Sequence, residues 1–181
     1  SSSGKLVAGL ENGTLFEVDL RSRASLKLSI QHSRKVFHVG YFKCKDQELF
    51  VSCSRDGGVM VFDKSGQKVS SLSHGVRGDA SFAYISRNRQ FMVSSSSRDN
   101  NIFVWDLVNI EELLPLSGHE APINKVQIVN DSLIISASKD GTVKLWHSIS
   151  WSEIKQAIHK ESLPNKQQAL IEAVKIYQFK K

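Results

Sequence analysis

Lys139-Asp-Gly-Thr-Val-Lys-Leu-Trp-His147 decides the fold, because three earlier stretches repeat it at a nearly constant interval. These are Glu11-Asn-Gly-Thr-Leu-Phe-Glu-Val-Asp19, Arg55-Asp-Gly-Gly-Val-Met-Val-Phe-Asp63 and Arg98-Asp-Asn-Asn-Ile-Phe-Val-Trp-Asp106. In each stretch a turn residue precedes an apolar run. The four turn residues are Asn12, Asp56, Asp99 and Asp140, so successive turns lie 44, 43 and 41 residues apart. A fixed period of this kind predicts similar structural units stacked side by side.

The period of about 40–45 residues, ending in a Trp-Asp-like pair, is typical of WD40 repeats. In these, four antiparallel strands, here named a to d from the axis outward, form one blade of a β-propeller. We therefore predict an all-β WD40 propeller fold with about four blades. The runs at 49–51, 91–93 and 133–135 open the b strands, and those at 59–62, 102–105 and 143–146 form the c strands. They are apolar on successive positions, which indicates strands covered on both faces.

The repeats divide the chain into five segments. A partial blade of strands b, c and d spans 1–31, and complete blades span 32–73 and 74–118. A blade at 119–160 carries a helical insertion between strands c and d, predicted from the helical spacing of Trp151, Ile154 and Ile158. Residues 161–181 are predicted to hold a terminal strand a that closes or starts another blade, because 169–176 aligns with 121–128. A helix from Asn165 also fits this last segment.

A chain that opens on strand b and closes on strand a has two predicted outcomes. The terminal strand could join the opening strands of the same chain, or the chain could form part of a ring of seven or eight blades. We favour the larger ring, because an open arc would expose apolar blade faces.

Composition indicates the cellular compartment of the protein and argues against some classes of partner. The formal net charge is +6 and the pI about 9.4, but the basic residues are spread along the chain and no nucleic-acid-binding motif occurs, which argues against nucleic acid. No apolar run reaches the roughly 18 residues of a membrane helix, so we expect no membrane partner. Cys44 and Cys53 lack metal-ligand spacing. We expect a cytoplasmic protein with a buried Cys53 thiol.

Three repeats contain serine, histidine and aspartate at corresponding positions, and two of them add tryptophan. The sets are His32, Ser52 and Asp56; His74, Ser95, Asp99 and Trp105; and His119, Ser136, Asp140 and Trp146. A hydrolase triad would need an exposed serine beside an oxyanion hole, and would not recur at the blade period. We predict buried hydrogen-bond networks, as in the WD40 proteins that this chain resembles. No catalytic residue, metal ligand or enzyme activity is expected.

The residue before each turn lies near the rim of the predicted ring. It is a cation in three consecutive repeats, at Arg55, Arg98 and Lys139, and an acid at Glu11 in the first. We interpret the three cations as candidate partner-binding residues for an acidic protein segment or a phosphate, although rim positions are often charged in any case. Charge complementarity would mainly steer and orient such a partner.

Finer features resemble the regulatory propellers of the apoptotic protease-activating factor family. They are the Gln31-His32 opening, the Gly118-His-Glu120 stretch leading to Asp140, and short a–b turns such as Arg87-Asn88 in place of Ser-Pro-Asp-Gly. The resemblance implies an apoptosome-type adaptor that activates caspases. Its caspase-recruitment and ATP- or dATP-binding modules would lie upstream, so this chain itself would hold no cofactor.

The same resemblance bears on the partners. Other blades or subunits of one assembly are implied as partners. Vertebrate members of the family bind cytochrome c, a basic protein, through acidic residues, so the basic rim here argues against that partner and favours an invertebrate-type member. The alternative is a generic WD40 scaffold, such as a ubiquitin-ligase adaptor or a complex-assembly subunit, because fold alone does not select a function.

Overall fold

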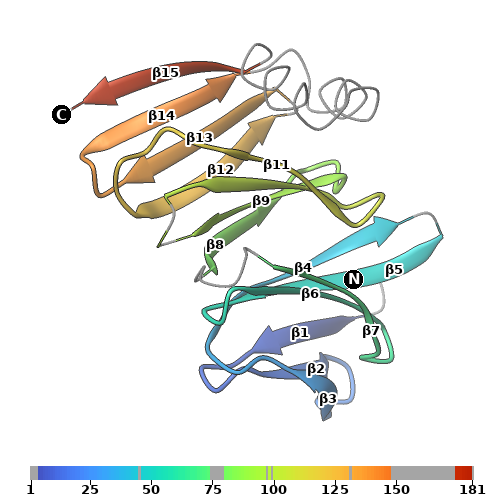
Figure 1. The fold of residues 1–181 in the computed structure, drawn as a ribbon. Coiled ribbons are helices and arrows are strands. Elements are labelled where there is room, and N and C mark those ends of the chain that lie inside the picture. The colour runs from blue at the N-terminus through green and yellow to red at the C-terminus, as the bar shows by residue number, and fades with distance from the viewer. Residues whose placement is uncertain are drawn as a thin grey trace.

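The computed structural model describes residues 4–44, 46–73, 80–96, 98, 100–130, 132–147 and 174–180. Within these ranges the chain is all-β, with four antiparallel sheets that follow one another in sequence order. Figure 1 shows them stacked as successive blades, with β1–β3 at one end and β12–β15 at the other. In the described part, no helix is long and apolar enough to span a membrane.

Each sheet is a meander whose strands pair in chain order. Blade 1 has three strands: β1 (Lys5–Gly9), β2 (Thr14–Asp19) and β3 (Ser25–Gln31). Blade 2 has four: β4 (Val36–Cys44), β5 (Gln47–Ser54), β6 (Gly58–Asp63) and β7 (Lys68–Ser73). Blade 3 has β8 (Ala80–Ile85), β9 (Phe91–Ser96), β10 (Ile102–Asp106) and β11 (Glu111–Leu116). Blade 4 has β12 (Ile123–Asn130), β13 (Leu133–Ser138), β14 (Thr142–His147) and β15 (Lys175–Lys180).

The turn that joins strands b and c is built in the same way in blades 1 and 4. Gly13 and Gly141 hold it with φ of 85° and 78°, a region that glycine enters without a Cβ clash. Their backbone N–H groups donate to the carbonyls of Leu10 and Ser138, at 3.2 Å and 3.3 Å. In blade 3 this left-handed conformation falls on Asn100, with φ of 58°. The glycine and asparagine residues of the repeated motif therefore occupy the turn positions that need a positive φ.

Apolar side chains fill the three spaces between neighbouring blades. Blades 1 and 2 enclose a cluster that includes Leu15, Leu28 and Phe62, and blades 2 and 3 enclose one that includes Val51 and Trp105. The third cluster, between blades 3 and 4, has these members: Phe91, Val93, Ile102, Val104, Leu113, Leu116, Ile123, Val126, Ile128, Ile134, Trp146 and Val174. Each blade thus contributes side chains from both faces when it has a neighbour on both sides.

The interior blades and the end blades differ in burial. Every residue of β9 and β10 is buried, whereas β13 and β14 alternate between buried and less buried positions. The two sets of strands are similarly apolar in sequence, so the difference comes from the neighbour that blade 4 lacks on its outer face. In blade 1, β1 alternates between half-buried and exposed positions.

The two cysteines lie in the cluster between blades 2 and 3. Both are free and buried, and the Cys44 thiol donates to the carbonyl of Val108 at 3.1 Å. Burial raises the pKa of Cys53 to about 12, which keeps its thiol protonated and unreactive at neutral pH.

The last strand corrects the sequence prediction. β15 pairs with β14, with Ile176 opposite Trp146, so it is the outermost strand d of blade 4 and not a strand a. It lies at the opposite end of the stack from β1 (Figure 1), so it does not join the opening strands of the chain. The predicted helices, at 151–160 and from Asn165, lie outside the described residues.

Candidate functional site

Blade 4 brings together the four residues of its predicted network. The His119 Nδ1 atom lies 2.7 Å from Asp140 Oδ2, and its Nε2 atom lies 2.7 Å from Ser136 Oγ. The indole N–H of Trp146 donates to the same Ser136 oxygen at 2.8 Å. The Ser136 oxygen and the Asp140 carboxylate thus lie on the two ring nitrogens of His119, and the carboxylate, which can only accept, takes the hydrogen of Nδ1.

Asp140 closes this network at the β13–β14 turn. Its Oδ1 accepts from the N–H and the hydroxyl of Thr142, at 2.8 Å and 2.6 Å, and its Oδ2 also accepts from the N–H of Glu120 at 3.1 Å. Burial alone would raise the pKa of Asp140, but the hydrogen bonds from Thr142, His119 and Glu120 outweigh it and lower the pKa well below its usual value. The carboxylate thereby ties the β13–β14 turn to the segment 119–120 that precedes β12.

Serine, histidine and aspartate are hydrogen-bonded here in the same order as in a hydrolase triad, but a substrate cannot reach the serine hydroxyl. Ser136 is 1% exposed, and the indole of Trp146, itself 1% exposed, occupies one side of the hydroxyl oxygen. A nucleophilic serine has to reach a substrate carbonyl beside an oxyanion hole. Within the described residues no group of side chains could hold a metal ion. The geometry therefore supports a structural role for the network.

Blade 2 has a network without tryptophan. His32 Nε2 lies 2.8 Å from Ser52 Oγ, and Nδ1 lies 3.2 Å from both carboxylate oxygens of Asp56. Phe62 is fully buried at the tryptophan position and stacks on Phe50, with ring centroids 5.6 Å apart. Burial lowers the pKa of His32 despite the opposing effect of Asp56. Because the folded state favours neutral His32, its contribution to stability is present above the unfolded pKa of about 6.5 and is lost as the pH falls below it.

Blade 3 corrects the predicted network at its serine. The indole N–H of Trp105 donates to Ser94 Oγ at 2.6 Å, not to Ser95, whose buried hydroxyl oxygen has no partner among the residues that the structure describes. His74 and Asp99 lie outside the described residues.

An extra residue in the β9–β10 turn explains this difference. Trp105 pairs with Met92 across the sheet and Trp146 pairs with Ile134, so the serine two residues further along the b strand is Ser94 in blade 3 and Ser136 in blade 4. Counting back four residues from the turn aspartate reaches Ser136 in blade 4, but in blade 3 it stops at Ser95, one residue short of Ser94. The apolar pair before the serine, Ile134-Ile135 in blade 4 and Met92-Val93 in blade 3, is the sequence signal that identifies Ser94.

Single alanine substitutions would separate the two serines. We expect Ser94→Ala to lower the free energy of unfolding by about 1–3 kcal/mol, because it leaves the buried indole N–H of Trp105 without an acceptor. Ser95→Ala removes a buried hydroxyl that has no partner in the described part of the chain, and it should be neutral or slightly stabilising. Urea denaturation of both variants measures the difference. Equal losses, or a larger loss for Ser95→Ala, would contradict the structural assignment.

Blade 1 holds no such network. The Oδ1 atom of Asn12 accepts the N–H of Thr14 at 3.1 Å, which closes the turn locally. The blade is instead tied to blade 2 through its backbone, because the N–H of His32 donates to the carbonyl of Gly13 at 3.0 Å. The turn therefore positions the histidine that begins the blade 2 network.

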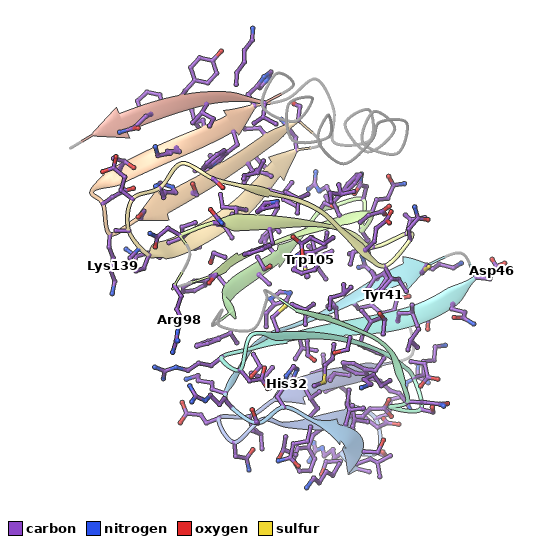
Figure 2. The ribbon with its side chains drawn as sticks, in the orientation of Figure 1. His32, Tyr41, Asp46, Arg98, Trp105 and Lys139 are labelled. Atoms are coloured by element: carbon purple, nitrogen blue, oxygen red, sulfur yellow. The ribbon has the colours of Figure 1, made fainter. Side chains whose placement is uncertain are left out.

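The three rim cations Arg55, Arg98 and Lys139 are all exposed. Figure 2 shows Arg98 and Lys139 on the same side of the stack, and Tyr41 and Asp46 on the opposite side. Arg55 lies in the corresponding β5–β6 turn. At the same position in blade 1, Glu11 forms an ion pair with Lys35 at 2.5 Å. The structure thus places the predicted basic residues along one edge of blades 2 to 4.

The opposite edge holds an interblade contact that the sequence did not predict. Tyr41 donates its hydroxyl to Glu48 at 2.7 Å, and Glu48 forms an ion pair with Lys64 at 2.6 Å. The guanidinium of Arg89, from the β8–β9 turn of blade 3, lies 4.7 Å from the centre of the Tyr41 ring. A depression of about 670 Å³ opens beside Glu48, between the β4–β5 turn and the β6–β7 loop. No motif links these residues, so no sequence signal could have found them.

Comparisons with known proteins agree with the division of the chain into propeller blades. The family described as "WD domain, G-beta repeat" matches residues 66–106 and 110–147. Each match begins shortly before the outer strand of one blade and runs through the first three strands of the next.

Several curated relatives are similar over about two thirds of the chain. "Ribosome biogenesis protein YTM1" of Candida glabrata is 29% identical over 68% of this chain and 31% of its own length. "Probable coatomer subunit beta'" of Schizosaccharomyces pombe is 32% identical, over 68% of this chain and 16% of its own length. "E3 ubiquitin-protein ligase COP1" of Arabidopsis thaliana is 26% identical, over 71% of this chain and 19% of its own length. The chain therefore spans less than a third of these relatives, and it contains WD40 repeats whose sheets form consecutive propeller blades.

Proposed function

We propose that this chain is part of a non-catalytic WD40 scaffold that binds other proteins. The observation that carries the proposal is the buried network of blade 4, in which serine, histidine and aspartate side chains arranged as in a catalytic centre instead hold strands and turns together. WD40 repeats generally serve as protein-interaction scaffolds, and the repeats found here support that general class. The relatives carry names from ribosome biogenesis, coatomer and ubiquitin ligation, which favours a generic scaffold.

We further propose that additional blades cover both ends of the stack. The outer face of blade 4 exposes Val143, Tyr177 and Phe179, at 41%, 51% and 57%, and blade 1 exposes Leu6 at 51%. Val143 and Phe179 lie opposite each other on β14 and β15, so they form one continuous apolar surface. Surfaces of this kind in soluble proteins usually mark an interface. Neighbouring blades would cover them in the way that blade 3 covers blade 2.

A second candidate is narrower: an apoptosome-type regulatory propeller. The Gln31-His32 opening and the Gly118-His-Glu120 stretch favour it. Such a protein would carry a nucleotide-binding module upstream of these blades, with a glycine-rich phosphate loop. The sequence of the full-length protein tests this, and an upstream segment without such a loop would rule the candidate out.

Photo-crosslinking at three positions tests the scaffold proposal in the full-length protein. A photoreactive residue would replace Glu120 on the turn edge, Tyr177 on the outer face of blade 4, or Arg87 on the opposite edge, all three of which are exposed. We expect adducts with other proteins at Glu120, adducts with further blades of the same assembly at Tyr177, and few adducts at Arg87. No protein adduct at any position would contradict the scaffold, whereas a lack of adducts at Tyr177 alone would contradict only the additional blades.

A further inference from the structure

His38 lies on β4, the inner strand of blade 2, and is separate from the histidine networks described above. The residue is half-buried, but its Nε2 atom is buried and has no hydrogen-bond partner in the described part of the chain. We propose that His38 makes the inner seam, the contact between β4 and β8, sensitive to pH: the seam is closed while the imidazole is neutral and loosens when the ring takes up a proton. This inference goes beyond the scaffold function, because it concerns how firmly two neighbouring blades hold together.

The His38 ring lies on the side of β4 that faces blade 3. A Cβ atom on Gly40 would lie 3.0 Å from His38 Nε2 and 2.1 Å from Ile85 Cδ1, so both side chains use the space that the glycine leaves open. Ile85 belongs to β8 and packs against the apolar cluster between blades 2 and 3. The buried nitrogen of His38 therefore lies beside backbone and hydrocarbon atoms at the inner seam.

This position suits a neutral imidazole better than a charged one. The neutral ring can carry its hydrogen on Nδ1 and leave Nε2 as a bare acceptor. The imidazolium ion carries a hydrogen on each nitrogen, so its Nε2–H would be a buried donor without an acceptor. Burial of the charge adds to this cost, and burial accordingly lowers the pKa of His38.

The strands packed against β4 supply no charge that would stabilise a protonated ring. His38 stands opposite Cys53 of β5, where burial raises the pKa of the thiol to about 12 and keeps it neutral. The sequence of β8 contains no charged residue. Its Tyr84 lies on the opposite face of the strand from Ile85, and Lys43 lies on the opposite face of β4 from His38.

The carboxylates of the surrounding elements already have partners of their own. The pairs are Asp56 with His32, Glu11 with Lys35, Glu17 with Lys5, and Glu48 with Lys64. Burial is the influence that sets the direction of the His38 pKa, with no opposing effect of a carboxylate. A proton on His38 is therefore best accommodated when the seam opens and the ring meets water.

Other contacts hold the two blades together while the inner seam loosens. At the far end of β4, the guanidinium of Arg89 lies 4.7 Å from the centre of the Tyr41 ring, and the Cys44 thiol donates to the carbonyl of Val108 at 3.1 Å. The apolar cluster that includes Trp105 joins the same blades further from the axis. Protonation of His38 should therefore cause a local opening and leave the fold intact.

The corresponding position in the other blades carries no histidine. Counted by sheet register, it is the residue opposite the one that follows the network serine: Phe82, opposite Ser95, in blade 3 and Lys125, opposite Ala137, in blade 4. The pH response is therefore specific to the seam between blades 2 and 3. Phe82 also shows which side chain of similar size a variant without titration can carry there.

Hydrogen exchange measured by mass spectrometry on the full-length protein, at pH 7.5 and pH 5.5, tests the inference. The closed seam favours the neutral ring, so its stability is present above the unfolded pKa of about 6.5 and is lost as the pH falls below it. After correction for the intrinsic exchange rate, we expect the equilibrium constant for opening of the β8 amides to rise up to about tenfold at pH 5.5. Amides of β10, inside blade 3, should change less than about twofold.

Two substitutions remove the titration. His38→Phe supplies an apolar ring, as at Phe82, and His38→Gln keeps a polar side chain that gains no proton; in both, the pH response of β8 should vanish, whatever their exchange at pH 7.5. The matched control is His147→Phe, which removes an exposed histidine of blade 4 and should leave the response unchanged. Circular dichroism would verify that each variant is folded at both pH values.

An NMR titration of the protein labelled with ¹³C in its histidine rings provides a second readout. The resonance that disappears in His38→Phe should titrate below pH 6.5. Exchange of β8 that ignores pH in the wild type, or that responds equally in His38→Phe, would overturn the inference, and so would a His38 ring that titrates at or above 6.5. The scaffold function would stand in each of these cases, because its own test is the adducts at Glu120.

Discussion

Replacing Asp140 with alanine is expected to lower the free energy of unfolding by about 2–3 kcal/mol, without removing any hydrolytic activity. The carboxylate accepts hydrogen bonds from His119, Glu120 and Thr142, and its loss leaves the Nδ1–H of a buried histidine without its acceptor. Removing one partner from a buried, charge-assisted network costs the desolvation of the partner that remains. Urea denaturation followed by tryptophan fluorescence measures the change, with Trp146 reporting from inside the network.

Asp19→Ala serves as the matched control for Asp140→Ala. Asp19 also accepts two backbone N–H groups, from Arg21 and Ser22, but in an exposed turn with no histidine. We expect a much smaller shift of the urea midpoint for this variant. An equal shift in the two variants would show that the histidine network adds nothing. An ester hydrolysis that disappears in a folded Ser136→Ala variant would overturn the structural role altogether.

The acid dependence of the wild type provides a second measure of Asp140. Because the folded protein lowers the pKa of Asp140, its stabilisation is fully present above the unfolded pKa of about 3.9 and is lost as the pH falls toward the folded value. Asp56 contributes with the same sign, because hydrogen bonds from Gly58 and Ser33 also outweigh burial and lower its pKa. Asp140→Ala should therefore lose less stability than the wild type between pH 5 and pH 2.

The sequence predicted the strands of blades 2 to 4 well, because each strand is determined by residues close to it in the chain. A turn such as Asp140-Gly141 and the apolar runs on either side form one hairpin, and neighbouring strands pair within a few residues. The rim cations and the blade 4 network follow from the same local spacing. In blade 4, the number of residues between a side chain and its turn was therefore enough to place that side chain correctly.

Sequence predicted less well where distant segments meet or where the spacing changes. The apolar pattern of 169–176 favoured a strand but could not say which strand lies beside it, and its end pairs with β14 across the segment 148–173. Ser95 was chosen over Ser94 because one added turn residue shifts the count, while the pleat of the sheet keeps Trp105 beside Ser94. The contact of Arg89 with the Tyr41 ring joins two blades, and Arg89 has a left-handed backbone, with φ of 58°, which its sequence does not mark.

The second large effect is expected at Gly13, where alanine should lower the free energy of unfolding by about 2–5 kcal/mol. With φ of 85°, the position imposes about 1–2 kcal/mol of strain on any residue with a Cβ atom. A Cβ there would also lie 2.0 Å from the carbonyl oxygen of His32 and 2.9 Å from that of Arg34. These are backbone atoms of the β3–β4 loop, which cannot rotate away as a side chain could, and such overpacking adds about 1–3 kcal/mol.

Gly141→Ala isolates the clash from the strain. Gly141 occupies the same turn position in blade 4, with φ of 78°, but a Cβ there meets no atom within 4 Å. Both variants carry the left-handed strain, so the difference between their urea midpoints measures the contact of blade 1 with the loop of blade 2. Hydrogen exchange at the His32 amide, which donates to Gly13, should accelerate in Gly13→Ala and stay unchanged in Gly141→Ala. Equal losses of stability would show that the β1–β2 turn does not anchor His32, and that the blade 2 network is set by its own strands alone.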